Sequence, residues 1–183
     1  MTGVQTCALP ISQTAYDAGA KGVMMFRWGL SNFIDFNKLN THEITPSYGD
    51  SVSINSILAA SASLKKYIED KGVLPKFVTV GNFNYTVPQF LYLMTKATEG
   101  IANGNLKAIT AILVNASSKT SGDVINKQLV KSEFVSLAKT LSSYMSANGI
   151  APGNVSSTLG DIKYESLIYA YARVLSYYQS NSA

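Results

Sequence analysis

Apolar residues recur at helical spacing in two stretches of the chain, from Val52 to Asp70 and from Lys131 to Ala147. Both stretches place apolar side chains at steps of three and four residues, which is typical of an amphipathic helix with one buried face. The apolar positions are Ile54, Ile57, Leu58, Leu64, Tyr67 and Ile68 in the first stretch, and Phe134, Leu137, Ala138, Leu141, Tyr144 and Met145 in the second.

The two stretches match over a longer distance when the chain is aligned with itself at an offset of 77 residues (134 − 57). Gly72 then falls on Gly149, and Pro75 falls on Pro152. Because a left-handed glycine ends a helix and a proline prevents its continuation, these pairs predict matching helix ends. A shared apolar period can arise from any two amphipathic helices, but matched Gly, Pro and Tyr indicate an internal duplication.

Each copy continues into a predicted hairpin and a second helix. In the first copy, Phe77–Val80 is rich in β-forming residues, and Gly81-Asn82 suits a two-residue turn. Thr86 ahead of Val87-Pro88 predicts the start of the second helix, because Thr caps helices and Pro suits their first turn. In the second copy the candidate turn, Gly160-Asp161, lies two residues later than the ungapped match requires.

Two further helices are predicted outside these segments. Gly104–Ala116 carries Leu106, Ile109, Ile112 and Leu113 on one helical face, and Tyr164–Gln179 is rich in tyrosine. Tyrosines at this density can form a core or a platform on which sugars stack. Four tyrosines of the chain lie at matched positions on apolar helix faces, and we expect these to be mainly core: Tyr67, Tyr144, Tyr92 and Tyr169.

The first copy also carries a motif, Tyr-Ile-x-x-x-Gly-x-Leu-Pro-x-x-Val-Thr-Val, followed by Gln-Phe-Leu-Tyr-Leu ahead of a Lys-Ala helix. This motif resembles the pseudomurein-binding repeat, which occurs in cell-surface and wall-lytic proteins of archaea with pseudomurein walls. The resemblance covers Tyr67–Ala97 and, less closely, Tyr144–Val174, where Asn154 replaces an aromatic residue and Ser156-Ser157 replaces the Thr-Val pair. It implies a module that binds the pseudomurein polymer, with an extracellular location at the cell wall or cell surface.

Upstream, the pattern Ala-Gly-Ala-x-Gly-Val-x-x-Phe-Arg-x-Gly-Leu resembles the last helix and eighth strand of a glycoside-hydrolase-like TIM barrel. That resemblance implies that Arg27 and Trp28 lie at the rim of a substrate cleft. In a lone fragment, by contrast, Phe26, Trp28 and Phe33 would only pack against neighbours. The expected organisation is a non-native leader (1–12), a barrel remnant (13–40), a linker (41–50), repeat 1 with an extra helix (51–116), a second linker (117–128) and repeat 2 (129–180).

The expected fold class is therefore mainly α. Two helix–(short β-hairpin)–helix repeats would form a small helical bundle, preceded by a βα remnant of a truncated α/β barrel. Among 183 residues, 46% are hydrophobic, which suffices for a core, and no apolar run reaches transmembrane length. The net charge of +4 is scattered along the chain, which argues against a nucleic-acid partner.

The chain offers little for catalysis. Cys7 is the only cysteine, and His42 is the only histidine and lies in the linker, so neither a nucleophile pair nor a zinc cluster is predicted. Among the carboxylates, Glu69 and Asp70 are adjacent and point in different directions, while Asp161 and Glu165 straddle a turn. We interpret these as solvated charges and expect no catalytic residue, no metal and no cofactor.

The candidate ligand contacts lie on or near the turn-rich segment of the first copy and at the start of the last helix: Phe77, Asn82, Asn84, Tyr85, Gln89 and Tyr164. The leading hypothesis is a non-catalytic wall-binding module that anchors a surface or wall-lytic protein to its polymer. Two alternatives stay open. One is an interaction or spacer module of a larger surface protein, and the other is a fragment of a pseudomurein-acting hydrolase whose catalytic part is missing.

Overall fold

The computed structural model describes residues 51–123 and 128–181. The chain divides between His42 and Glu43, and all of these residues belong to the second unit, Glu43–Ala183. The expected leader, barrel remnant and first linker, with Arg27, Trp28, His42 and Cys7, lie outside the described residues. The elements in chain order are β1 (Ser51–Val52), α3 (Ile54–Lys71), β2 (Phe77–Val80), β3 (Phe83–Thr86), α4 (Val87–Ala102), β4 (Ile109–Thr110), α5 (Lys131–Asn148), β5 (Asn154–Ser157), β6 (Gly160–Lys163) and α6 (Tyr164–Asn181).

The described part of the chain is mainly α, as predicted, with four helices and three small antiparallel sheets. The sheets pair β1 with β4, β2 with β3, and β5 with β6. We call Ile54–Ala102 the first half, Lys131–Asn181 the second half, and residues 103–123 the connecting segment. The first three helical and strand elements of the two halves begin and end 77 residues apart (131 − 54 for α3 and α5), and α4 and α6 also begin at that spacing.

Local sequence signals explain where the first helix of each half ends. Gly72 adopts a left-handed φ of 70°, and its N–H donates to the carbonyl of Ile68 at 2.8 Å. Gly149 does the same with a φ of 65°, donating to Met145 at 2.9 Å. A side chain at either position would strain the backbone, so glycine stops both helices at the predicted place.

The hairpin of the first half also has the predicted turn. Phe77 pairs with Thr86 and Val80 with Phe83, and Gly81 supplies the positive φ of 62° that the turn needs. The α4 helix then starts at Val87, where the Thr86 N–H donates to the Gln89 side chain at 2.9 Å.

The predicted turn of the second hairpin, Gly160-Asp161, is wrong. Gly160 is the first residue of β6, paired with Ser157, so the turn lies at residues 158–159, where the ungapped match places it. Side chains hold this turn without a leading glycine. The Thr158 N–H and hydroxyl donate to Glu133 at 2.7 and 2.8 Å, and the Ser157 hydroxyl donates to the Gly160 carbonyl at 2.7 Å.

The predicted helix Gly104–Ala116 is also wrong, because this part of the connecting segment is extended or irregular. Gly104 has a φ of 69° directly after α4, and Ile109–Thr110 then pairs with β1. Leu106 and Leu113, expected on a buried helical face, are exposed. Pairing with a distant strand has outweighed the local apolar period, which could not distinguish the two outcomes.

The connecting segment lies along the second half and adds backbone pairing to it. The Asn115 N–H donates to the Gly149 carbonyl at 2.8 Å, and the Asn115 carbonyl accepts from Ala151 at 2.9 Å. Further on, Asp123 bridges to Ile162 in β6. The segment therefore fixes the loop and the hairpin that follow α5.

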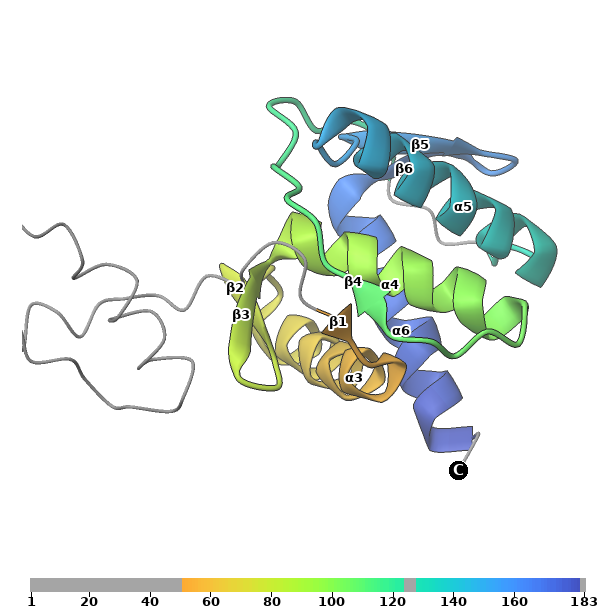
Figure 1. The fold of residues 1–183 in the computed structure, drawn as a ribbon. Coiled ribbons are helices and arrows are strands. Elements are labelled where there is room, and N and C mark those ends of the chain that lie inside the picture. Colours follow the sequence, from red (N-terminus) through yellow and green to blue (C-terminus); the bar gives the residue numbers. More distant parts are fainter. Residues whose placement is uncertain (1–50, 124–127, 182–183) are drawn as a thin grey trace, which may run out of the picture. The chain divides into compact units, whose positions relative to one another are not determined.

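The helices of the two halves exchange partners. Helix α3 packs mainly against α6, and α4 packs mainly against α5. Each of the two most extensive helix–helix contacts therefore joins a helix of one half to a helix of the other. Figure 1 shows α4 between α3 and α5, with α6 passing behind it. Small buried side chains lie on the packing faces of the two first helices, Ser61 in α3 and Ala138 in α5. The core is a single cluster that includes residues from both halves.

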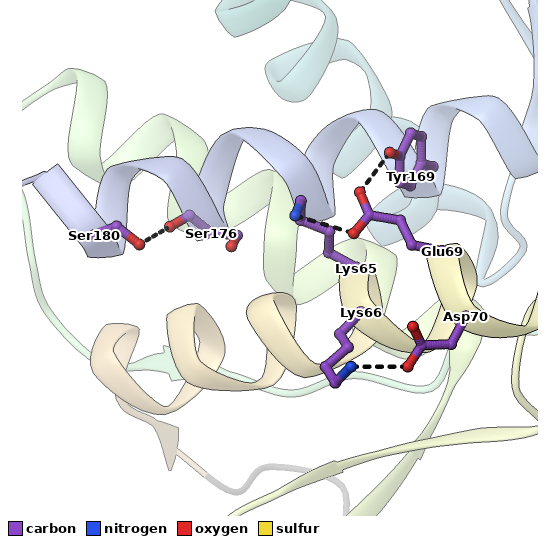
Figure 2. A network of polar contacts seen from close by, with 7 residues as sticks. All are labelled: Lys65, Lys66, Glu69, Asp70, Tyr169, Ser176 and Ser180. Carbon is purple, nitrogen blue, oxygen red and sulfur yellow. Dashed lines mark hydrogen bonds and ion pairs between the residues drawn. The ribbon is translucent and has the colours of Figure 1, made fainter.

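Polar contacts reinforce both exchanged pairs. Between α3 and α6, the Tyr169 hydroxyl donates to Glu69 Oε1 at 2.8 Å, and Glu69 Oε2 accepts from Lys65 at 3.1 Å (Figure 2). Between α4 and α5, the Ser142 hydroxyl donates to Glu99. The hydrogen bond from the Tyr169 hydroxyl, and to a smaller extent the one from Lys65, holds the pKa of the Glu69 carboxyl below its ordinary value. The contacts thus favour ionised Glu69 at neutral pH.

The exchange of partners predicts that neither half folds alone. In a fragment ending at Asp123, α3 and α4 lose α6 and α5, and most of the stability of a helix in a protein comes from such tertiary packing of its apolar face. We expect the fragment to show no cooperative thermal transition by circular dichroism at 222 nm. Mixing it with a fragment that begins at Gln128 should restore the helical signal, and a cooperative transition in either fragment alone would contradict the interlocked core.

Glu69→Gln should lower the melting temperature at neutral pH and lose this effect in acid. The pKa of Glu69 is depressed in the folded chain, so its stabilisation is present above the unfolded pKa and disappears as pH falls through the folded pKa. The measurement is thermal unfolding between pH 7 and pH 2. Asp70→Asn is the matched control, because Asp70 pairs with Lys66 within α3 and not with α6 (Figure 2).

Gly153→Ala should destabilise the connecting segment. A Cβ at Gly153 would lie 1.8 Å from the Lys119 carbonyl oxygen, so the backbone must move. Overpacking of this kind costs about 1–3 kcal/mol of unfolding free energy. Urea unfolding measures the loss, and Ser118→Ala, an exposed change in the same segment, should stay within about 0.5 kcal/mol. Equal stabilities for the two variants would mean that the close approach does not matter.

Candidate binding surfaces

Three of the predicted ligand contacts reach solvent on the first hairpin. Asn82 is exposed in the turn, and Phe77 and Asn84 are half-buried on β2 and β3. The Lys76 ammonium lies 4.9 Å from the centroid of the Phe77 ring, close enough for a cation–π contact. The Asn84 side chain accepts a hydrogen bond from the Thr79 hydroxyl at 2.8 Å. These side chains form a polar and aromatic surface that a ligand can approach.

Tyr85 and Gln89 do not belong to that surface, which corrects the prediction for these two residues. Tyr85 is 1% exposed and lies in the core, because alternate side chains of a strand face opposite sides. Gln89 is buried at the start of α4, where its side-chain oxygen accepts from the N–H and the hydroxyl of Thr86. Both side chains serve the packing and capping of the first half.

Tyr164, the remaining candidate, is buried at the start of α6, and its hydroxyl has no hydrogen-bond partner within the described residues. Burial, with a smaller contribution from the adjacent Glu165, raises the pKa of this phenol far above its ordinary value. Tyr164 lines a cleft of about 340 Å³ between the start of α4 and the connecting segment. The other lining residues are Leu74, Pro75, Lys76, Thr86, Val87, Pro88, Val114, Asn115 and Ala116.

The corresponding surface of the second half is covered by the chain itself. Leu74, Lys76 and Thr86 in the cleft correspond to Ala151, Gly153 and Lys163 at the 77-residue spacing. All three residues of the second half are hydrogen-bonded by backbone groups of the connecting segment. The cleft therefore marks a difference between the halves.

The two hairpins share a polar cross-strand pair. Thr79 pairs with Asn84 in the first hairpin, and Ser156 pairs with Asp161 in the second. The Ser156 hydroxyl donates to Asp161 Oδ1 at 2.6 Å, in the same arrangement as Thr79 and Asn84. Hydroxyl and carboxamide or carboxylate groups thus lie on the solvent-facing side of both hairpins.

The expectation of four core tyrosines is correct only in part. Tyr92 is 7% exposed and belongs to the core, and Tyr169 is half-buried. Tyr67 and Tyr144 are instead 39% and 45% exposed. The buried stripe of each first helix runs through the small residues at 61 and 138, which leaves the tyrosines at its edge. Two exposed aromatic side chains thus recur at the same position of both halves.

The tyrosines of α6 divide between the core and the surface. Tyr171 is fully buried, with its ring centroid 4.4 Å from that of Phe134 and its hydroxyl donating to the Phe134 carbonyl at 3.2 Å. Tyr177, in contrast, is 70% exposed. Arg173 lies between Tyr169 and Tyr177 on the helix and was missed as a candidate. The spacing of four residues from Tyr169 to Arg173 to Tyr177 is the signal that could have identified it.

Within residues 51–123 and 128–181, no group of three or more His, Cys, Asp or Glu side chains could hold a metal ion. Glu69 and Asp70 point to different partners, as expected, and Asp161 and Glu165 lie in β6 and the first turn of α6, not on either side of a turn. No described helix is long and apolar enough to cross a membrane.

Comparisons of the chain with protein-family models, with curated proteins and with solved structures found no match.

Proposed function

We propose that the two halves are copies of one unit and that together they form a module that binds pseudomurein without cleaving it. In this proposal the upstream residues 13–40 are the remnant of a hydrolase-like barrel, and the protein is located at the cell wall or cell surface. The resemblance of Tyr67–Ala97 to the pseudomurein-binding repeat supports the ligand. The equal spacing of the elements in the two halves supports the duplication.

The recurrence of Tyr67 and Tyr144 on the surface is the observation that carries the binding function. Core packing does not require an exposed aromatic residue at one position of a unit, and still less at the same position of both units. Val73 and Ile150, each directly after the glycine that ends a first helix, are also exposed at matching positions. Each half therefore presents a tyrosine together with an aliphatic side chain.

A repeating polymer is the ligand that suits two similar surfaces on one folded unit. A tyrosine ring offers an apolar face to a sugar and keeps a hydroxyl for hydrogen bonding. When one chain carries two weak sites, occupation of the first raises the effective concentration at the second, which can increase avidity by roughly 10²–10⁴. The recurring hairpin pairs, Thr79–Asn84 and Ser156–Asp161, give each half a further polar pair on the solvent-facing side of its hairpin.

The proposal predicts that the intact chain sediments with isolated pseudomurein sacculi and that both tyrosines contribute. Tyr67→Ala and Tyr144→Ala should each weaken binding, because avidity requires both sites. The double variant should weaken it further, by roughly 10²-fold or more in total. Depletion of the chain from the supernatant gives the affinity. Truncation is unsuitable here, since removal of α6 also removes the packing partner of α3.

The control is Leu106→Ala, which removes an exposed apolar side chain from the connecting segment. It should bind as tightly as the unaltered chain does. Circular dichroism should show that every variant keeps the fold of the unaltered chain. Binding that is unchanged in the double variant would exclude these tyrosines. Failure of the unaltered chain to bind sacculi would exclude pseudomurein binding and favour the spacer alternative.

A further inference from the structure

One side of α6 carries aromatic and cationic side chains that lie beside its buried face. The helix buries Leu167, Ile168, Tyr171, Ala172 and Leu175. Tyr169, Arg173 and Tyr177 follow one another at steps of four residues, so they lie one above another along the helix. Tyr169 is half-buried, Arg173 is exposed, and Tyr177 has the most exposed large hydrophobic side chain in the described part of the chain. We call these three residues the α6 platform.

The Arg173 guanidinium is available for a ligand. Its central carbon lies 5.9 Å from the centroid of the Tyr169 ring, in the range of a cation–π contact. Within the described residues no carboxylate lies at ion-pair distance from it. The charge of Arg173 makes a small contribution to lowering the pKa of Glu69, after those of Tyr169 and Lys65. The Glu69 carboxylate already accepts hydrogen bonds from these two residues.

The ring of Tyr169 is held in place from the other half of the molecule. Its hydroxyl donates to Glu69 Oε1 on α3, and Glu69 is held in turn by Lys65 (Figure 2). A side chain fixed before binding loses little conformational freedom when a ligand arrives. Glu69 is thus a positioning residue for the platform.

The corresponding side of α4 is built differently. Tyr92 corresponds to Tyr169 and is buried, and Lys96 corresponds to Arg173 and lies 3.5 Å from Glu99. Gly100 corresponds to Tyr177, and a Cβ there would lie 2.5 Å from the Asn105 carbonyl oxygen. The connecting segment therefore closes this side of α4. The α4 side has no counterpart of the exposed Arg173 and Tyr177 beside a half-buried Tyr169, so the platform is a feature of α6 alone.

We propose that the α6 platform binds a sugar ring that carries a carboxylate. The planar guanidinium of Arg173 can pair with a carboxylate through two parallel hydrogen bonds, which an ammonium cannot match. The rings on either side of Arg173 offer apolar faces to the C–H groups of the sugar. This inference rests on the proposed polymer binding and adds that the part of the polymer in contact with α6 is an acidic sugar.

The test measures binding of the intact chain to pseudomurein sacculi in the presence of soluble competitors. A tetramer of galacturonic acid should displace the chain, whereas its methyl ester, which keeps the ring but lacks the charge, should not. Tetraglutamate, which carries carboxylates without a sugar ring, should also fail. Equal displacement by the methyl ester or by tetraglutamate would overturn the assignment to an acidic sugar.

Variants locate the site. Arg173→Gln and Tyr177→Ala should each weaken sacculus binding about tenfold. Arg173→Lys should weaken it nearly as much as Arg173→Gln does, because the ammonium lacks the planar fork of the guanidinium. Lys139→Gln removes a charge from an exposed position of α5 and should bind normally. If Arg173→Gln binds as tightly as the unaltered chain, the platform is excluded while polymer binding stands. If the unaltered chain does not bind sacculi at all, both proposals fall.

Sedimentation velocity separates a sugar from a second copy of the chain as the occupant. The unaltered chain should be monomeric at the concentrations of the binding assay. A dimer that dissociates in Tyr177→Ala would show that the platform is a protein interface, and would overturn the proposal.

Discussion

The exchange of helix partners between the halves is the constraint on which the rest of this structure depends. An amphipathic helix must bury its apolar face against another element, and here α3 does so on α6 and α4 on α5. Neither half could bury both of its helices in the same way by itself. The core therefore forms only when both halves are present, and the 77-residue spacing fixes which elements of the two halves correspond. Any surface shared by the halves is held on one folded unit.

The connecting segment makes the two halves unequal. It leaves α4 at Gly104, pairs with β1 at Ile109–Thr110 and then follows the second half as far as Asp123. Its passage beside Gly153 requires a residue without a Cβ, whereas the corresponding Lys76 lines an open cleft. Corresponding surfaces of the two halves thus differ because the connecting segment covers them differently, even where the helices and strands beneath have matching bounds.

Local signals made much of this fold readable in the sequence. The helices α3 and α5 and the first hairpin lie within two residues of their predicted bounds, because Gly72, Gly149 and Gly81 act through their own φ angles. The choice of helix partner was not readable, since either apolar stripe could pack on either second helix. For the same reason the apolar period of residues 104–116 could not exclude pairing with a distant strand.

The candidate site was harder to predict, because exposure depends on tertiary neighbours. Tyr67 and Tyr144 belong to the apolar pattern, yet they lie at the edge of the stripe that α6 and α4 cover. Tyr85 is in a turn-rich segment, yet strand alternation turns it inward. In both cases the sequence singled out the residue by its type but did not show in which direction its side chain points.

The position of α6 explains why new surface chemistry would arise there. Helix α4 contacts α3, α5 and α6, and most of its residues are buried. A change at Lys96 or Gly100 would disturb the Glu99 pair or the return of the connecting segment. On helix α6, Arg173 and Tyr177 are exposed, so a residue at either position can change without a packing cost. The peripheral helix α6 is therefore free to carry an arginine and a tyrosine at positions where the central helix α4 must keep a paired lysine and a glycine.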